Sequence, residues 1–215
     1  MGYFLYQILK IPLLLALPFV ILIRGSVLLH TNYNWLPWPA LIGGALAAAL
    51  ILIIYLSLLH GKITGRMNSK GALKRRSIIA LILVIGYCVH GALFLSSRNA
   101  KGSDVQSEYT SLHPILRLGV STMVWMDKDL IMTDGSRQPE DYKKMGLKTI
   151  KRSLHYKQRN GYSHAFDIRT NNRSELRNTL LTLYFKMMGF NTLRHVGTAD
   201  HLHISLYSHD HPGAI

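Results

Sequence analysis

The chain has 215 residues and a formal net charge of +14, and none of its acidic residues lies within residues 1–97. The surface of a soluble globular domain carries charges of both signs, and such a domain rarely runs this far without a carboxylate. A segment embedded in lipid avoids carboxylates because charge is costly in hydrocarbon. The first 97 residues therefore predict a membrane segment.

The basic excess does not predict a nucleic-acid partner. Residues 98–215 contain seventeen Lys and Arg against eleven Asp and Glu, with neither a basic run nor a recognisable RNA- or DNA-binding motif. The remaining basic residues flank the apolar runs of the first 97 residues. We therefore expect a lipid bilayer, and no nucleic acid, among the partners of this chain. The single cysteine, Cys88, excludes an intrachain disulfide and is predicted to be a small buried apolar residue.

Three apolar runs are long enough to cross a bilayer, which needs about 20 residues. They extend from Phe4 to Ile23, from Pro39 to Leu59 and from Ser77 to Ser97. The first contains Lys10, whose ammonium group can reach the headgroups. This run lacks the strongly basic start and small-residue cleavage site of a signal peptide, so we expect it to be retained. Residues 1–97 are thus predicted to form an anchor of three transmembrane helices.

The charges of the two connecting loops predict the orientation of the anchor. The loop after the second run carries six basic residues, whereas the first loop carries Arg24 together with Trp35 and Trp38, which suit a membrane interface. The six are Lys62, Arg66, Lys70, Lys74, Arg75 and Arg76. Because basic loops stay in the cytoplasm, the N-terminus is expected there and residues 98–215 on the outer side of the cytoplasmic membrane, periplasmic or extracellular.

Beyond the anchor, residues 98–110 are small and polar and are predicted to be a linker, which leaves 111–215 as a separate domain. Helices are expected over 114–126, from Pro139 onward and over 172–188, and strands over 129–133, 165–170, 192–196 and 201–207. Helices mixed with short strands predict a small α+β domain.

Two patterns in this domain indicate a metal site or a catalytic pair. In the strand that begins at His201, alternation places His201 and His203 on one face and the apolar Leu202 and Ile204 on the other. In an earlier strand Asp167 lies between Phe166 and Ile168, where an unpaired carboxylate would be costly. Two imidazoles and one carboxylate are a common catalytic zinc set, with the fourth position left for water.

The motifs Ser153-Leu154-His155-Tyr156, Ala165-Phe166-Asp167-Ile168-Arg169-Thr170 and Asp200-His201-Leu202-His203 occur in this order along the chain. Together they resemble the zinc D-Ala-D-Ala carboxypeptidases and murein endopeptidases, which belong to the lysostaphin, D-Ala-D-Ala metallopeptidase and hedgehog group. The stretch from Thr133 to Pro139 resembles the upstream Gly-x-Arg-x-Pro element of that family. The resemblance covers about Asp129 to Leu206 and none of the membrane half, and it implies a metallopeptidase-like domain with an antiparallel sheet.

The resemblance implies roles for six residues of this chain. His155, Asp167 and His203 match the metal ligands, with zinc (Zn2+) as the cofactor. Asp200 matches the acidic general base, His201 the histidine that assists at the water or the transition state, and Arg137 an arginine that shapes the site or holds a substrate carboxylate. It leaves open whether Asp200 or His201 makes the main proton transfer.

The spacing of the first two ligands departs from the family pattern. His155 and Asp167 are twelve residues apart, whereas seven is usual in the family. An insertion within the polar stretch 157–163 explains the difference, because loops accept insertions at little cost. The alternative ligand to His155 is His164, but it lies three residues before Asp167, so on one strand the two would face opposite sides.

The expected function is that of a membrane-anchored zinc peptidase that cleaves D-amino-acid-containing peptides of peptidoglycan, as a carboxypeptidase or an endopeptidase. Three spans exceed what tethering requires, which leaves room for a membrane-protein partner. One alternative is a non-catalytic zinc-binding or cell-wall-binding module of the same fold. Another is a 2H-type phosphoesterase, since His203-Ile204-Ser205 fits its signature, but that fold needs a second copy. His113, His209 and His211 are expected at the surface, and His90 in helix packing.

Overall fold

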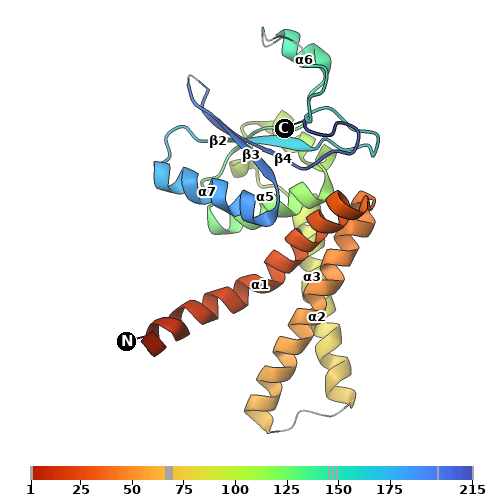
Figure 1. The fold of residues 1–215 in the computed structure, drawn as a ribbon, viewed down its shortest axis with the longest axis vertical. Coiled ribbons are helices and arrows are strands. Elements are labelled where there is room, and N and C mark those ends of the chain that lie inside the picture. Colours follow the sequence, from red (N-terminus) through yellow and green to blue (C-terminus); the bar gives the residue numbers. More distant parts are fainter. Residues whose placement is uncertain are drawn as a thin grey trace.

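The computed structural model describes residues 2–65, 70–144, 146, 148, 150–197 and 199–214, without the side chains of 2–11 and 144. Arg66 of the basic loop lies outside the described residues. Three long helices, α1 (Gly2–Tyr33), α2 (Pro37–Thr64) and α3 (Lys70–Leu93), carry a mixed domain at one end, and the C-terminal end of α2 and the N-terminal end of α3 lie at the opposite end (Figure 1).

Three helical segments are long and apolar enough to cross a membrane, namely Pro12–Tyr33, Pro37–Thr64 and Lys70–Leu93. Large apolar side chains on their outer faces are exposed, among them Ile42, Leu46 and Leu50 of α2, as expected for helices that face lipid rather than water. The first helix continues past the predicted end at Ile23 to Tyr33. Proline at the start of α2 and a left-handed Gly65 after its last residue set the limits of that helix.

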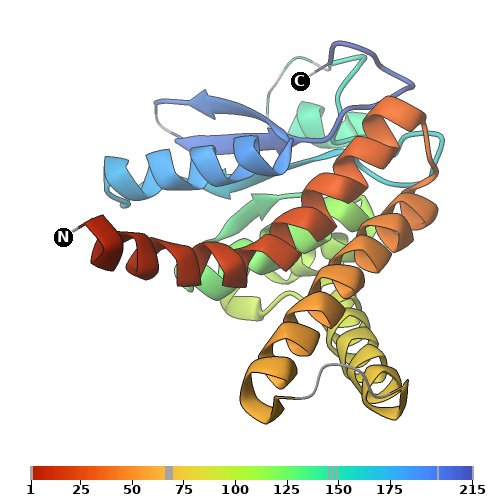
Figure 2. The same cartoon turned by 60° about the horizontal axis from the view of Figure 1, so that its bottom comes forward.

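The helices of the anchor pack through small residues. In Figure 1, α2 and α3 run side by side, whereas α1 meets α2 near its own C-terminal end and diverges toward its N-terminus, as the turned view in Figure 2 also shows. At the contact, Gly44 of α2 lies directly against Ser26 and the carbonyl of Leu22 in α1. Small residues let two helix backbones approach closely inside a membrane, and Gly44 has this role here.

The domain contains a four-stranded antiparallel sheet of β1 (Met132–Asp134), β2 (Ala165–Arg169), β3 (Asn191–His195) and β4 (His201–Ser205), in the order β1-β2-β4-β3. Helices α5 (Pro114–Met126) and α7 (Glu175–Met188) cover one face of this sheet (Figure 1). There the ring of Phe166 on β2 packs edge-on against Phe185 on α7, with 5.8 Å between the ring centroids. The prediction of a small α+β fold with an antiparallel sheet is therefore confirmed.

The segment predicted as a linker is folded into the domain. Residues 97–111 form two 3-10 turns, Ser97–Asn99 and Tyr109–Ser111, around the short helix α4 (Ser103–Glu108). The Tyr109 hydroxyl is buried and donates to the carbonyl of Gly91, and Arg117 of α5 donates to the carbonyl of Ala92 over 2.7 Å. These bonds satisfy the last carbonyls of α3, which have no partner within the helix. The short polar segment thus caps the C-terminal end of α3, because the side chain of its Tyr109 is buried in the core.

One hydrophobic core runs through both halves of the molecule. Leu22, Val27 and Ala48 of the anchor belong to the same cluster of buried side chains as Leu116, Phe185 and Ile204 of the domain. Because the two sets of side chains belong to one cluster, the anchor and the domain are packed as one body.

We predict that Gly44→Ala weakens the packing of α1 on α2. A Cβ atom at this position would lie 2.3 Å from the Leu22 carbonyl oxygen, a backbone atom that only moves with its helix. Overpacking of this kind costs about 1–3 kcal/mol, so thermal unfolding in detergent should occur at a lower temperature than in the wild type. Gly86→Ala in α3 is the matched control, because nothing lies within 4 Å of its Cβ position. Equal melting temperatures for the two variants would contradict this packing.

Candidate metal centre

The structure brings His155, Asp167 and His203 together on the sheet face opposite to α5 and α7. Asp167 on β2 and His203 on β4 are direct cross-strand partners, so their side chains project from the same face. His155 comes from the loop that precedes β2, and all three side chains are buried. These residues form one of the groups in the described part of the chain that could hold a metal ion.

The spacing of the three nearest ligand atoms fits a small tetrahedral ion. His155 Nε2 lies 3.2 Å from His203 Nδ1, His203 Nδ1 lies 2.9 Å from Asp167 Oδ1, and His155 Nε2 lies 3.4 Å from Asp167 Oδ1. Ligands about 2.0–2.1 Å from a tetrahedral zinc ion are roughly 3.3 Å apart. The triangle of donor atoms therefore has the size of one face of such a tetrahedron. Calcium prefers ligand sets made of oxygen atoms alone, so a set with two nitrogens does not suit it.

Hydrogen bonds around the triangle orient its donors. The Nδ1 atom of His155 lies 2.8 Å from the carbonyl oxygen of Gly135. A carbonyl can only accept, so Nδ1 carries the proton and Nε2 presents its lone pair to the triangle. This arrangement is the usual one for metal-binding histidines. The opposite nitrogen of His203, Nε2, is buried and has no hydrogen-bond partner among the described residues.

Arg137 lies where it can balance the charge of Asp167. Its NH2 group donates to Asp167 Oδ2 over 2.9 Å, and its Nε donates to Asp134 Oδ2 over 2.8 Å. Burial by itself would raise the pKa of Asp167, but His155 and His203 outweigh it and hold the pKa well below its usual range. Asp167 is therefore a carboxylate, the form that a metal ion requires. Burial disfavours the charged Arg137 side chain, yet Asp134 and Asp167 together raise its pKa.

Sequence reasoning missed the residues that support this arrangement. The Tyr142 hydroxyl lies 2.8 Å from Ser153 Oγ and accepts from Arg137 over 3.3 Å. Ser153 Oγ in turn accepts from the backbone N–H of His155 over 3.3 Å, which explains why a serine stands two residues before this histidine. Ser153 was part of a recognised motif, but no sequence signal connected Tyr142 with it.

The two candidate proton-transfer residues differ in position. His201 Nε2 lies 3.9 Å from Asp167 Oδ2, and its side chain is 28% exposed. Its Nδ1 lies 2.8 Å from the Ala199 carbonyl, which leaves the Nε2 lone pair free to accept a proton. Asp200 points elsewhere, because its Oδ1 accepts from the backbone of Gly197 and its Oδ2 lies 3.4 Å from Arg194. In this conformation His201, and not Asp200, lies beside the metal-ligand group.

The stretch predicted as an insertion, 157–163, forms a tight loop that rests on the anchor. Gln158 and Tyr162 pair through their backbones over 2.9 Å, with Gly161 in the left-handed region at φ +83. The Tyr162 hydroxyl accepts from the indole N–H of Trp38 in α2 over 3.0 Å. His164, the alternative to His155, follows this loop, but its ring packs 4.8 Å from that of His113, outside the triangle.

The expectation that His113 lies at the surface is wrong, because this residue is fully buried at the N-terminus of α5. Its backbone N–H donates to the Ser163 carbonyl, and its ring packs against those of His30 and His164. His209 is exposed, as expected.

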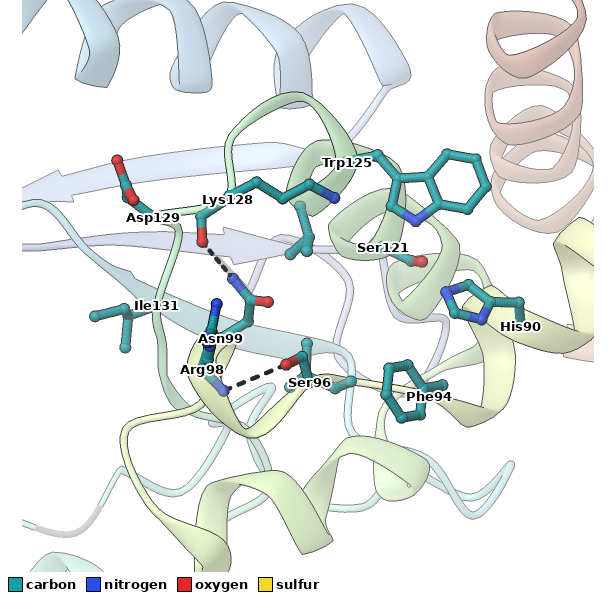
Figure 3. A pocket seen from close by; sticks show the side chains of 12 residues that line it. His90, Phe94, Ser96, Arg98, Asn99, Ser121, Trp125, Lys128, Asp129 and Ile131 are labelled. Atoms are coloured by element: carbon teal, nitrogen blue, oxygen red, sulfur yellow. Dashed lines mark hydrogen bonds between the residues drawn. The ribbon is translucent and has the colours of Figure 1, made fainter.

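A cavity of about 680 Å³ lies between α3, the Ser97–Asn99 turn and the end of α5 (Figure 3). Figure 3 shows His90 and Trp125 on one side of it and Lys128 and Asp129 on the other, with Asn99 donating to the Lys128 carbonyl over 3.0 Å. None of the residues predicted for the metal centre lines this cavity. His90, expected to serve helix packing, is one of its lining residues.

The chain was compared with protein-family models, with curated proteins and with solved structures. No family model, no curated protein and no solved structure matches it.

Proposed function

We propose that this protein is a membrane-anchored zinc peptidase that cleaves peptides of peptidoglycan. The observation that carries the proposal is the triangle of His155 Nε2, Asp167 Oδ1 and His203 Nδ1, whose edges of 2.9–3.4 Å match a tetrahedral ion. The resemblance of the surrounding motifs to murein peptidases supports the substrate class, including peptides that contain D-amino acids. Carboxypeptidase and endopeptidase action both fit the site.

The donor set supports zinc over other ions. Two imidazoles and one carboxylate leave the fourth tetrahedral position open, as in catalytic zinc sites. Zinc held there would supply Lewis-acid chemistry by polarising the scissile carbonyl and making water more acidic. Gly135 keeps His155 in the correct tautomer, and Arg137 neutralises the outer oxygen of Asp167, so both hold the ligands in place for such an ion.

The groups beside the triangle supply proton transfer and substrate binding. His201 Nε2 is the better placed base, since the Ala199 carbonyl holds the proton of this ring on Nδ1. It takes a proton from the attacking water and returns it to the leaving amine. Arg137 is partly exposed and already faces two carboxylates, so we assign it a positioning role rather than contact with the peptide.

The outer side of the cytoplasmic membrane is the proposed location of the domain. The α1–α2 connection, the end of α3 and the domain lie at one end of the anchor, whereas the last turn of α2 and the first turn of α3 lie at the other (Figure 1). Basic loops stay in the cytoplasm, so the domain faces the cell wall, where newly made peptidoglycan is within reach. A membrane-protein partner for the three spans remains part of the proposal.

We expect His203→Ala to remove bound zinc and hydrolysis together. The full-length protein, purified in detergent, would be analysed for zinc and incubated with isolated peptidoglycan, with new amino groups as the readout. Asp167→Asn is the second variant, because an amide has nearly the shape of the carboxylate but no charge. His211→Ala, outside the triangle, is the matched control and should keep both properties.

Hydrolysis at the wild-type rate by a zinc-free, folded His203→Ala protein would overturn the peptidase proposal. Zinc binding in the wild type without hydrolysis of any peptidoglycan peptide would favour the non-catalytic module instead.

The positions of His201 and Asp200 predict different losses on substitution. His201→Gln should abolish most of the turnover while zinc binding persists, because the proton acceptor beside the site is lost and the three ligands remain. Asp200→Asn should affect turnover less, since its carboxylate holds the turn at Gly197. Steady-state turnover and zinc content of the two variants would be compared side by side. A larger loss in Asp200→Asn would mean that this carboxylate turns toward the site during the reaction.

A reporter fused to the C-terminus tests the orientation. Alkaline phosphatase, which is active only outside the cytoplasm, should be active after Ile215 and inactive when inserted between Thr64 and Lys70. The reverse pattern would place the domain in the cytoplasm and remove peptidoglycan as the substrate.

A further inference from the structure

A second group of histidines lies where the domain meets the anchor. His30 comes from the last turns of α1, His113 precedes α5, and His164 precedes β2. Their exposed fractions are 3%, 0% and 1%. The ring centroids are 4.6 Å apart for His30 and His113, 4.8 Å for His113 and His164, and 5.6 Å for His30 and His164. One ligand atom from each residue lies within 4.8 Å of the others.

Hydrogen bonds to carbonyls orient two of these rings in the same way as His155. His30 Nδ1 lies 2.9 Å from the Trp35 carbonyl, and His164 Nδ1 lies 3.1 Å from the Tyr207 carbonyl. A carbonyl can only accept, so in both rings the proton is on Nδ1 and the lone pair on Nε2. His30 Nε2 is buried without a hydrogen-bond partner among the described residues, and His164 Nε2 lies 2.8 Å from the Asn160 amide nitrogen.

His113 completes the group with a third buried nitrogen. Its Nδ1 accepts from the backbone N–H of Ile115 over 3.3 Å, at the long end for a hydrogen bond, and its Nε2 has no partner among the described residues. Burial lowers the pKa of His113 well below its usual value and lowers that of His164 to about 4, with neighbouring histidines adding to the effect. Both rings are therefore neutral at physiological pH, and the neutral ring is the form that binds metals.

Two buried nitrogens without partners are costly in a folded protein unless something binds them. A cavity of about 240 Å³ opens beside the group, and His30, His164, His209 and Asp210 are among its lining residues. The cavity gives an ion a way in and leaves room for a further ligand. Asp210 supplies a negative charge on the same side, which would offset part of the charge of a cation.

We propose that His30, His113 and His164 form a second metal site, for a divalent transition ion such as zinc, that fastens the domain to the first membrane helix. Three imidazoles suit zinc, copper or nickel and do not suit magnesium or calcium, which prefer oxygen. In this structure the ring proton of His113 is on Nε2. Coordination of an ion by Nε2 would move this proton to Nδ1, and the long hydrogen bond from the Ile115 N–H would be lost. The site shares no ligand with His155, Asp167 and His203, so it does not depend on the proposed peptidase activity.

The position of His164 gives the second site a mechanical consequence. His164 ends the 157–163 loop and lies three residues before Asp167, at the entry to β2. An ion held by His30 and His164 would therefore fix the start of the strand that carries Asp167 against the membrane helix. The ion would thereby add a link between the domain and the anchor to the core that they share.

Counting bound metal in the full-length protein tests this site. The detergent-purified chain would be stripped with a chelator, reloaded with zinc, dialysed and analysed for metal. We expect about two zinc ions per wild-type chain, about one in His30→Gln and in His203→Ala, and about none in the double variant. His90→Gln, a histidine of α3 outside both groups, is the matched control and should keep the wild-type content.

A ligand-replacement variant separates loss of a ligand from loss of folding. His30→Cys places a thiolate at the same position, so reloading with cobalt should restore the second ion and add a sulfur-to-cobalt absorption band that the wild type lacks. Wild-type zinc content in both His30→Gln and His164→Gln would overturn the second site. That result leaves the peptidase proposal intact, since the latter is judged on His203→Ala.

Discussion

Asp167 is a carboxylate buried in the middle of a sheet, and its negative charge has to be balanced where it lies. The guanidinium of Arg137 and the ring of the cross-strand partner His203 place nitrogen atoms 2.9 Å from its two oxygens, and His155 Nε2 lies 3.4 Å from Oδ1. Around them, Ser153, Tyr142 and the Gly135 carbonyl hold the nitrogens in place. A buried charge that lost one of these partners would be strongly destabilising. The same requirement that stabilises the fold also brings together a set of side chains that could hold a metal ion.

The alternation of β2 and β4 allows this polar centre to exist beside a hydrophobic core. Phe166 pairs with Ile204 and Ile168 with Leu202 on the face that α5 and α7 cover, whereas Asp167 pairs with His203 on the other face. A shift of the register by one residue would exchange the two faces, so the register is strongly determined by burial. Arg137 and His155, which lie before and after the short helix α6 (Pro139–Lys144), contact Asp167 on the polar face.

The anchor is part of the fold rather than a tether. Residues from all three long helices belong to the same core as the domain, and Arg117 and Tyr109 cap the end of α3 from the domain side. The 157–163 loop strengthens this junction, because Tyr162 bonds to Trp38 and the guanidinium of Arg117 lies 5.8 Å from the Trp38 ring and 5.5 Å from the Tyr162 ring. The orientation of the candidate site relative to the bilayer is thereby set by packing. The stretch predicted as an insertion is therefore one of the contacts between the two halves.

The sequence by itself determined the features that depend on local composition and periodicity. The three spans, the helix at Pro114–Met126 and the strands that carry Asp167 and His203 follow from runs of apolar residues and from alternation, both of which are readable along the chain. The meeting of His155, Asp167 and His203 was predicted as well, because their motifs resemble those of a metallopeptidase family. What only the tertiary structure decided are contacts between distant segments. Tyr142 reaches Ser153, Tyr109 caps α3 inside a predicted linker, and His30, His113 and His164 meet although 51 to 134 positions separate them. No local sequence pattern predicts these contacts, because each of the side chains is positioned by the packing of distant segments on the shared core.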